Sequence, residues 1–304
     1  MQIYSSWHHE KRRKVKNLSR VVVLVLCVLL SGCSSIVDSE NKWFRDSNVC
    51  KKLVGDVLVY PVFVEQKKGE LWAEEDRFQY LDSLQVALMW IQKQAAADAI
   101  KLNFVTHAHP KVMKKGLPGK SVKGALEMFG GTKSFTKFNK HYDGISKKVS
   151  PSIEKEEKLK PFVKKIKSKE RLIAKLRNVY QVESVVLMFV HKPEDLSHLY
   201  LNLNSLTNKD VEYMVTTFQA PTVIAYQVLQ LYGAATMMYN SGKKKEKASK
   251  LIVEDKFPED IMANLGKTIQ SLEMGEYTKY LIGWSNVEEE YYKSIVSERS
   301  VIVK

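Results

Sequence analysis

The chain has 304 residues, a formal net charge of +14, 44% hydrophobic residues and 27% charged residues. This composition is typical of a globular protein and excludes a disordered, collagenous or multi-span membrane protein. The three cysteines exclude a disulfide framework. The length fits one domain with insertions, or two domains at most.

Residues 1–32 are predicted to be a secretory signal. Six basic residues precede residues 21–30, which form an unbroken run of ten apolar residues, and small residues follow. A basic segment, a short apolar run and small residues are typical of such signals. The run is too short to cross a bilayer, which takes roughly 20 apolar residues.

The end of the apolar run, Leu30-Ser31-Gly32-Cys33, resembles the lipobox of bacterial lipoproteins. The resemblance implies that Cys33 becomes the new N-terminus and is acylated, with palmitate as one expected chain. Ser34 resembles the residue that directs lipoproteins to the outer membrane of Gram-negative bacteria. We therefore expect a lipid-anchored protein of the cell envelope, in the outer rather than the inner membrane; an ordinary signal with an incidental cysteine is the alternative.

Residues 33–52 are expected to be a polar tether, and residues 53–304 the folded domain. Cys50 is the one cysteine left for the mature chain once Cys27 is removed and Cys33 carries lipid, so no intrachain disulfide is expected. Residues 57–64 predict a buried strand, with Pro61 indicating a sheet edge or a bulge. An amphipathic helix after Trp72 and a strand over 100–105 complete a β-α-β opening.

Residues 111–170 contain 17 lysines against six acidic residues. We interpret about 111–161 as a lysine-rich surface insertion, followed by a helix over 162–180. Three readings of the lysines stay open: a solvated face, attraction to anionic lipid headgroups or lipopolysaccharide, or an acidic protein partner. Nucleic acid is not expected, because the chain is predicted to be exported and the lysines lack arginine and regular aromatic neighbours.

The rest of the chain alternates strands and helices. Residues 185–190 are fully apolar and predict a central strand, and residues 211–218 predict another. A helix is expected from Pro221 through Leu231, with the proline in its first turn. A loop through 242–245 then leads to 257–262, and a last helix is expected over 287–297. The predicted fold class is α+β, with an α/β-like opening.

The segment 220–239, APTVIAYQVLQLYGAATMMY, resembles the active-site helix of metzincin-type zinc metallopeptidases. Those enzymes carry two histidines four residues apart, a glutamate beside the first, then a glycine and a third ligand. Asp260-Ile261-Met262 resembles the tight turn whose methionine underlies their zinc, and residues 278–284 resemble a segment that follows it. The resemblance implies a mixed sheet, an active-site-type helix, a Met turn and a C-terminal helix.

Aligned by Gly233, the family's two histidines fall on Tyr226 and Gln230, its glutamate on Gln227 and its third ligand on Thr236. Zinc prefers imidazole, thiolate and carboxylate ligands, and none stands at these positions. No residue there can act as general base for a zinc-bound water. The resemblance therefore implies an inactive homologue without metal or cofactor that binds a peptide or protein partner in the old cleft between the sheet edge and the helix.

Three other interpretations remain open. Residues 220–239 also fit a plain core helix. His107 and His109, two apart near a strand end, face the same side of a strand and mark a possible unrecognised enzyme site, although solvent-exposed loop histidines explain them as well. No serine-nucleophile motif, phosphate-binding loop or dinucleotide-binding motif is present. A purely structural envelope lipoprotein is the remaining possibility.

Overall fold

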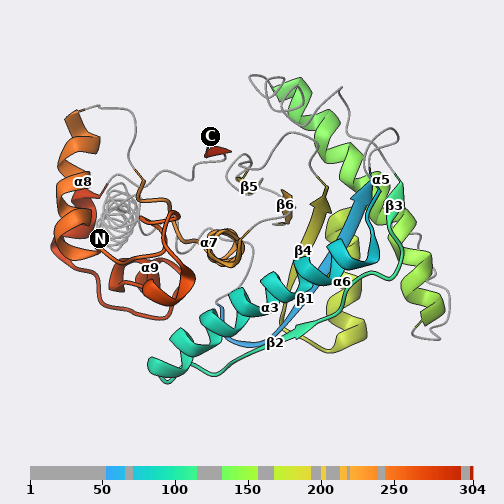
Figure 1. The fold of residues 1–304 in the computed structure, drawn as a ribbon, viewed down its shortest axis with the longest axis horizontal. Helices are drawn as coiled ribbons and strands as arrows, with labels where there is room; N and C mark the ends of the chain where they lie inside the picture. The colour runs from blue at the N-terminus through green and yellow to red at the C-terminus, as the bar shows by residue number, and fades with distance from the viewer. Residues whose placement is uncertain are drawn as a thin grey trace, which may run out of the picture. The chain divides into compact units, whose positions relative to one another are not determined.

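The computed structural model describes residues 53–65, 71–114, 132–156, 168–192, 200–202, 213–217, 220–238, 244–295 and 302–303. They form a seven-stranded sheet with helices packed on both faces, which confirms the predicted α+β class (Figure 1). The predicted signal, Cys33, the tether and Cys50 lie outside these ranges. None of the helices in these ranges combines the length and the apolar character needed to cross a membrane.

The sheet is mixed. Its strands lie in the order β2-β1-β4-β6-β5-β7, with β3 also beside β1. β1, β2, β3, β4 and β6 run parallel, whereas β5 is antiparallel to both β6 and β7. The strands are β1 (Gly55–Glu65), β2 (Leu102–Thr106), β3 (Met113–Lys114), β4 (Ser184–His191), β5 (Tyr200–Asn202), β6 (Met214–Thr217) and β7 (Ile302–Val303).

The β-α-β opening is confirmed, with α3 (Glu74–Ala97) between β1 and β2. The edge position that Pro61 suggested is wrong, because β1 has β2 and β3 on one side and β4 on the other. Pro61 accepts a hydrogen bond from His109 N at 2.8 Å, so its missing N–H also faces that neighbour. β2 pairs with β1 only as far as Val59, and β3 resumes pairing at Val64. The proline therefore interrupts the neighbouring strand.

Both faces of the sheet are buried. Along β1, Val57, Val59 and Phe63 point into a cluster with α3 and the later helices, whereas the alternate residues point into a second cluster. Every residue of β4 is buried. This double burial explains why the two strands read as continuous apolar runs, as the sequence predicted for 185–190.

The predicted surface insertion is wrong over Thr132–Glu156, which forms the 25-residue helix α5. Tyr142, Ile145, Val149 and Ile153 are buried at spacings of three and four and join the second cluster. The lysines between these apolar residues concealed the helical period. Ser168 then caps α6 (Lys169–Tyr180) by accepting from Arg171 N; residues 162–167 of the predicted helix lie outside the described ranges.

The C-terminal elements follow the prediction only in part. The helix α7 (Pro221–Leu231) is confirmed, and α8 (Lys244–Lys256) occupies part of the expected loop. α9 (Glu276–Leu281) and the 3₁₀ helix Ile269–Ser271 were not predicted. The predicted last helix over 287–297 is wrong, since only a 3₁₀ helix at Glu290–Ser294 forms there. In that stretch Tyr292 and Ile295 alone are buried among the described residues, which is too little apolar surface to hold a longer helix.

Candidate functional site

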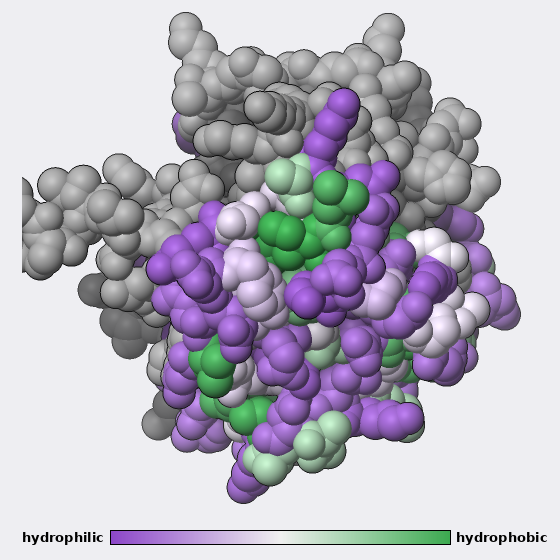
Figure 2. Space-filling model, turned by 90° about the vertical axis from the view of Figure 1, so that its left-hand side faces the viewer, coloured by the Kyte–Doolittle hydropathy of each residue, from purple (hydrophilic) through white to green (hydrophobic). Residues whose placement is uncertain are grey.

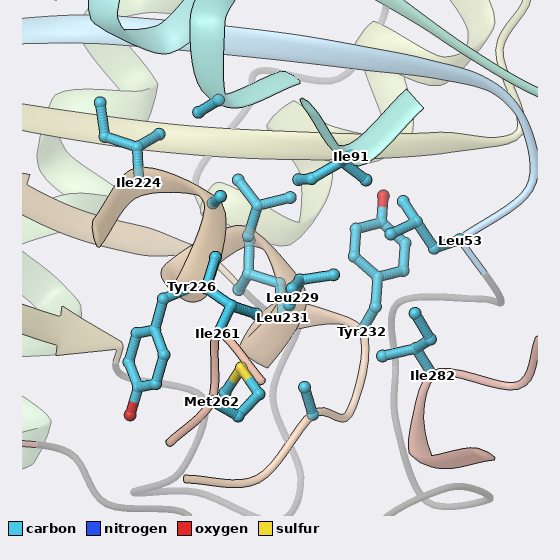
Figure 3. Close-up of a cluster of buried hydrophobic side chains, with 14 of the residues drawn as sticks. Leu53, Ile91, Ile224, Tyr226, Leu229, Leu231, Tyr232, Ile261, Met262 and Ile282 are labelled. Atoms are coloured by element: carbon cyan, nitrogen blue, oxygen red, sulfur yellow. The ribbon is translucent and has the colours of Figure 1, made fainter. Parts of the chain in front are cut away.

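α7 is enclosed by the rest of the protein. Ala220 precedes it in extended conformation and Pro221 occupies its first turn, where a missing N–H has no cost. Every residue from Thr222 to Leu231 is buried, so the helix presents no open face. In Figure 3 the helix lies between Ile91 of α3 and Met262. A helix that is buried on all sides is part of the core.

Tyr226 and Gln230 occupy the two predicted ligand positions. They lie one helical turn apart, and Gln230 Nε2 donates to Tyr226 Oη at 2.9 Å. Their side chains are 1% and 7% exposed. The predicted common face is therefore confirmed, but it holds a neutral hydrogen bond within the core. Neither group can supply a charged ligand.

Gln227, at the position of the family's glutamate, points towards the sheet. Its Oε1 accepts from Thr216 Oγ1 of β6 at 2.9 Å, and the residue is 0% exposed. Its Nε2 has no hydrogen-bond partner among the described residues. An amide in this place has no basic atom with which to take a proton from water.

The chain leaves α7 through a tight turn. Gly233 has φ 107°, a conformation that favours glycine, and Ala234 N donates back to Leu229 O at 3.1 Å. Thr236, the predicted third position, is 3% exposed and accepts from Met238 N at 3.3 Å. Met237 N donates to Met262 O at 2.9 Å, so this segment runs directly beside the Met-turn-like segment.

The side chain of Asp260 organises that second segment. Its Oδ1 accepts from Met262 N at 2.7 Å, and its Oδ2 accepts from Gly275 N at 2.9 Å and Thr278 Oγ1 at 2.8 Å. The residue is completely buried, and this burial raises the pKa of the carboxyl to about 6 although the three hydrogen bonds oppose the rise. Asp260 thus joins the Met-turn-like segment to the start of α9.

A recess of about 370 Å³ opens beside these segments. Apolar side chains of the segment after Gly233, of α8 and of the chain on both sides of Asp260 line it, together with charged side chains of α8. The lining residues are Met237, Met238, Lys250, Val253, Glu254, Phe257, Pro258, Ala263 and Asn264. Figure 2 shows the face that carries α8 and α9. Small groups of exposed apolar side chains lie there among hydrophilic ones. This recess lies beside the segment that leaves α7.

The four positions predicted from the resemblance therefore lie close together, but in the hydrophobic core and not in an open site. Tyr226, Gln227, Gln230 and Thr236 are all buried, and in the described part of the chain no three His, Cys, Asp or Glu side chains gather where a metal ion could be held. The sequence interpretation missed Asp260 as the organising group. The signal was present, since Asp260 and Thr278 both lie in segments singled out by the resemblance.

His107 and His109 lie where the chain passes Pro61. The His107 ring stacks on Tyr60 at 5.8 Å between centroids, and His109 Nδ1 is 3.0 Å from Tyr60 Oη. His109 is only 1% exposed, so the expectation of solvent-exposed loop histidines is wrong for this residue. Burial, reinforced by Lys111 and His107, lowers the pKa of His109 to about 4. The ring is held uncharged against the sheet.

A second buried histidine has the same kind of partner. His191, at the end of β4, lies 3.0 Å from Tyr142 Oη of α5 through its Nε2. Burial lowers the pKa of His191 to about 3, and the neighbouring His141 adds to the effect. Both histidines therefore favour the folded state only in their neutral form.

No protein-family model matches the chain, and a search of curated proteins finds no similar sequence.

The contact between Asp260 and Gly275 predicts a steric effect. A Cβ at Gly275 would lie 2.6 Å from Asp260 Oδ2 and 3.0 Å from Phe257, so Gly275→Ala should lower the free energy of unfolding by about 2 kcal/mol. Gly266→Ala is the matched control, because nothing lies within 4 Å of its Cβ. Urea unfolding measures both variants. Equal stabilities would contradict the role given to Asp260.

The buried histidines predict acid sensitivity. The unfolded chain takes up their protons near pH 6.5, but the folded chain only near 4 and 3. The free energy of unfolding should therefore fall as pH drops from 6.5 to 4, by about 1.4 kcal/mol per pH unit for each histidine. Asp260 acts in the opposite direction, since its raised pKa favours the folded state at low pH, but it is one group against two.

His191→Gln isolates this effect, because the amide can still hydrogen-bond Tyr142 and does not titrate. Urea unfolding between pH 7.5 and 4 should give a shallower pH dependence for this variant. His107→Gln, at a half-buried position, is the control. A slope identical to that of the wild type in His191→Gln would show that this histidine is not the titrating group.

Proposed function

We propose that this protein is a membrane-anchored lipoprotein of the bacterial envelope whose folded part is a catalytically inactive, metallopeptidase-like scaffold that acts by binding. The mixed sheet, the helix that follows β6 and the turn at Gly233 support the scaffold. The observation that carries the proposal is the hydrogen bond from Met237 N to Met262 O at 2.9 Å. It sets a Met-turn-like segment directly beside the chain that leaves α7.

Burial and chemistry support inactivity. A peptidase of the resembled type needs charged or imidazole ligands that face a substrate and a water molecule. Here Gln230 donates a hydrogen bond to Tyr226, and Gln227 accepts one from Thr216 of strand β6. A substrate has no access to these groups, since all three are buried.

The proposed partner is a peptide or protein segment that carries an apolar side chain. The enclosed α7 leaves no cleft between Tyr226 and Gln230, so the expected place of binding shifts to the recess beside Met237 and Phe257. The recess combines apolar side chains with the charged side chains of Lys250 and Glu254, and apolar contacts together with a few polar groups are typical of ligand sites.

The anchor is tested at Cys33. Cys33→Ala should abolish incorporation of labelled fatty acid and leave an uncleaved precursor or a soluble form, because no thiol remains at the lipobox position. Acyl labelling and membrane fractionation measure both. Cys50→Ala is the control and should keep its label. Unchanged labelling of Cys33→Ala would exclude the lipoprotein assignment.

The scaffold is tested by restoring the family's residues. The variant Tyr226→His, Gln227→Glu, Gln230→His and Thr236→Asp should bind zinc, because positions 226 and 230 already face each other one turn apart. Zinc at 100 times its Kd should then raise the free energy of unfolding by about 2.7 kcal/mol. Metal content after dialysis and thermal melting with and without zinc are the measurements.

The control carries the same changes but keeps Gln230, so it lacks one ligand and should take up less zinc. Circular dichroism establishes that both variants fold. The wild-type chain should carry no stoichiometric zinc and should not cleave casein. A folded variant that takes up no more zinc than the control would show that α7 is an ordinary core helix, and the metallopeptidase-like assignment would be dropped.

A further inference from the structure

The outer face of α5 is a row of lysines. Among the residues of α5 whose side chains the structure describes, five are exposed, and four of these are lysines: Lys140, Lys147, Lys148, Pro151 and Lys155. Intervals of seven, one and seven residues keep the lysines on one side of the helix. They span a stripe about 22 Å long, from the rise of 1.5 Å per residue. We call these four lysines the α5 stripe.

Asp143 is the one acid of α5 whose side chain lies in the described part of the chain, and it is turned towards α6. Asp143 accepts from both the backbone N and Nζ of Lys169, at 3.2 and 3.3 Å, and so faces α6. The exposed surface of α8 is built differently, since Lys250 there forms an ion pair with Glu254 at 3.6 Å. A solvated helix usually mixes the two signs in this way. Among the side chains that the structure describes, the α5 stripe does not mix them.

The stripe adds no packing to the protein. The apolar side of α5 already fills the core through Tyr142, Ile145 and Val149. The four exposed lysine charges therefore remain available to an external anionic surface.

We propose that the α5 stripe docks onto anionic phospholipid headgroups. Lysine is a compact charge on a flexible stem, which suits a fluid array of headgroups, whereas fixed bidentate recognition of a single phosphate or carboxylate favours arginine. An exposed row along one helix face offers a membrane plane many contacts. The choice of a membrane over other polyanions rests on the proposed anchor at Cys33, which would hold the chain beside one.

The test measures binding of the full chain in a Cys33→Ala background to two kinds of vesicle. One contains phosphatidylcholine alone, and the other contains equal parts of phosphatidylcholine and phosphatidylglycerol. Each lysine near such a surface contributes about 1 kcal/mol, so neutralising the stripe should weaken binding about 30-fold if two of the four lysines contact headgroups. The stripe variant is Lys140→Gln, Lys147→Gln, Lys148→Gln and Lys155→Gln, and co-sedimentation is the measurement.

The matched control removes the same charge elsewhere on the surface, with Lys93→Gln, Lys101→Gln, Lys247→Gln and Lys256→Gln. These four lysines are also exposed. The control should bind anionic vesicles within about threefold of the parent. Added salt should weaken binding of parent and control, since exposed charges are screened beyond about 8 Å at physiological ionic strength. Thermal melting establishes that both variants are folded.

Three results would overturn the proposal. Equal binding by the stripe variant and its parent would return the lysines to a solvated face or to an acidic protein partner. Equal losses in the stripe variant and the control would show a net-charge effect without a docking face. Equal binding to both vesicle types would assign the attachment to the apolar residues 21–30. Because the assay uses a chain without lipid, failure of the anchor itself appears separately, in acyl labelling of Cys33.

Discussion

The C-terminal part of the fold depends on one buried carboxylate. Asp260 lies inside the protein, where an unpartnered charge would cost several kcal/mol, and three donors compensate it: Met262 N, Gly275 N and Thr278 Oγ1. Two of these donors come from 15 and 18 residues further along the chain, so the carboxylate closes a long loop. It also fixes Met262, whose carbonyl accepts from Met237. The course of the chain after α7 follows from this arrangement.

The sheet imposes the second constraint. Its central strands β1 and β4 are apolar on both faces, so each face must be covered by helices. α3 and α7 cover one face, whereas α5 and α6 cover the other (Figure 1). α5 therefore has two functions at once, since its apolar side completes the core and its other side sets the charge of the surface.

The sequence predicted those elements whose pattern is local. α3, β4 and α7 have a clear helical period or a continuous apolar run, and the structure confirms them. α5 was missed because lysine content outweighed its apolar period, and the role of Asp260 because a carboxylate is ordinarily exposed and its partners are distant in sequence. The site positions on α7 were placed correctly on one helix face, but no local pattern showed that the rest of the chain encloses them.

The hydrogen bond between Gln230 and Tyr226 has an evolutionary consequence. Both groups are buried, so a substitution at Tyr226 that removes the hydroxyl leaves Gln230 Nε2 without this acceptor, at a cost of about 1–3 kcal/mol. The two positions are therefore epistatic: each constrains what the other can become. A lineage that carries this pair and changes Tyr226 first passes through an intermediate in which Gln230 Nε2 has lost this acceptor. Because proteins are only marginally stable, selection would remove most such destabilised intermediates. The Tyr226–Gln230 pair would therefore tend to keep α7 a buried core helix.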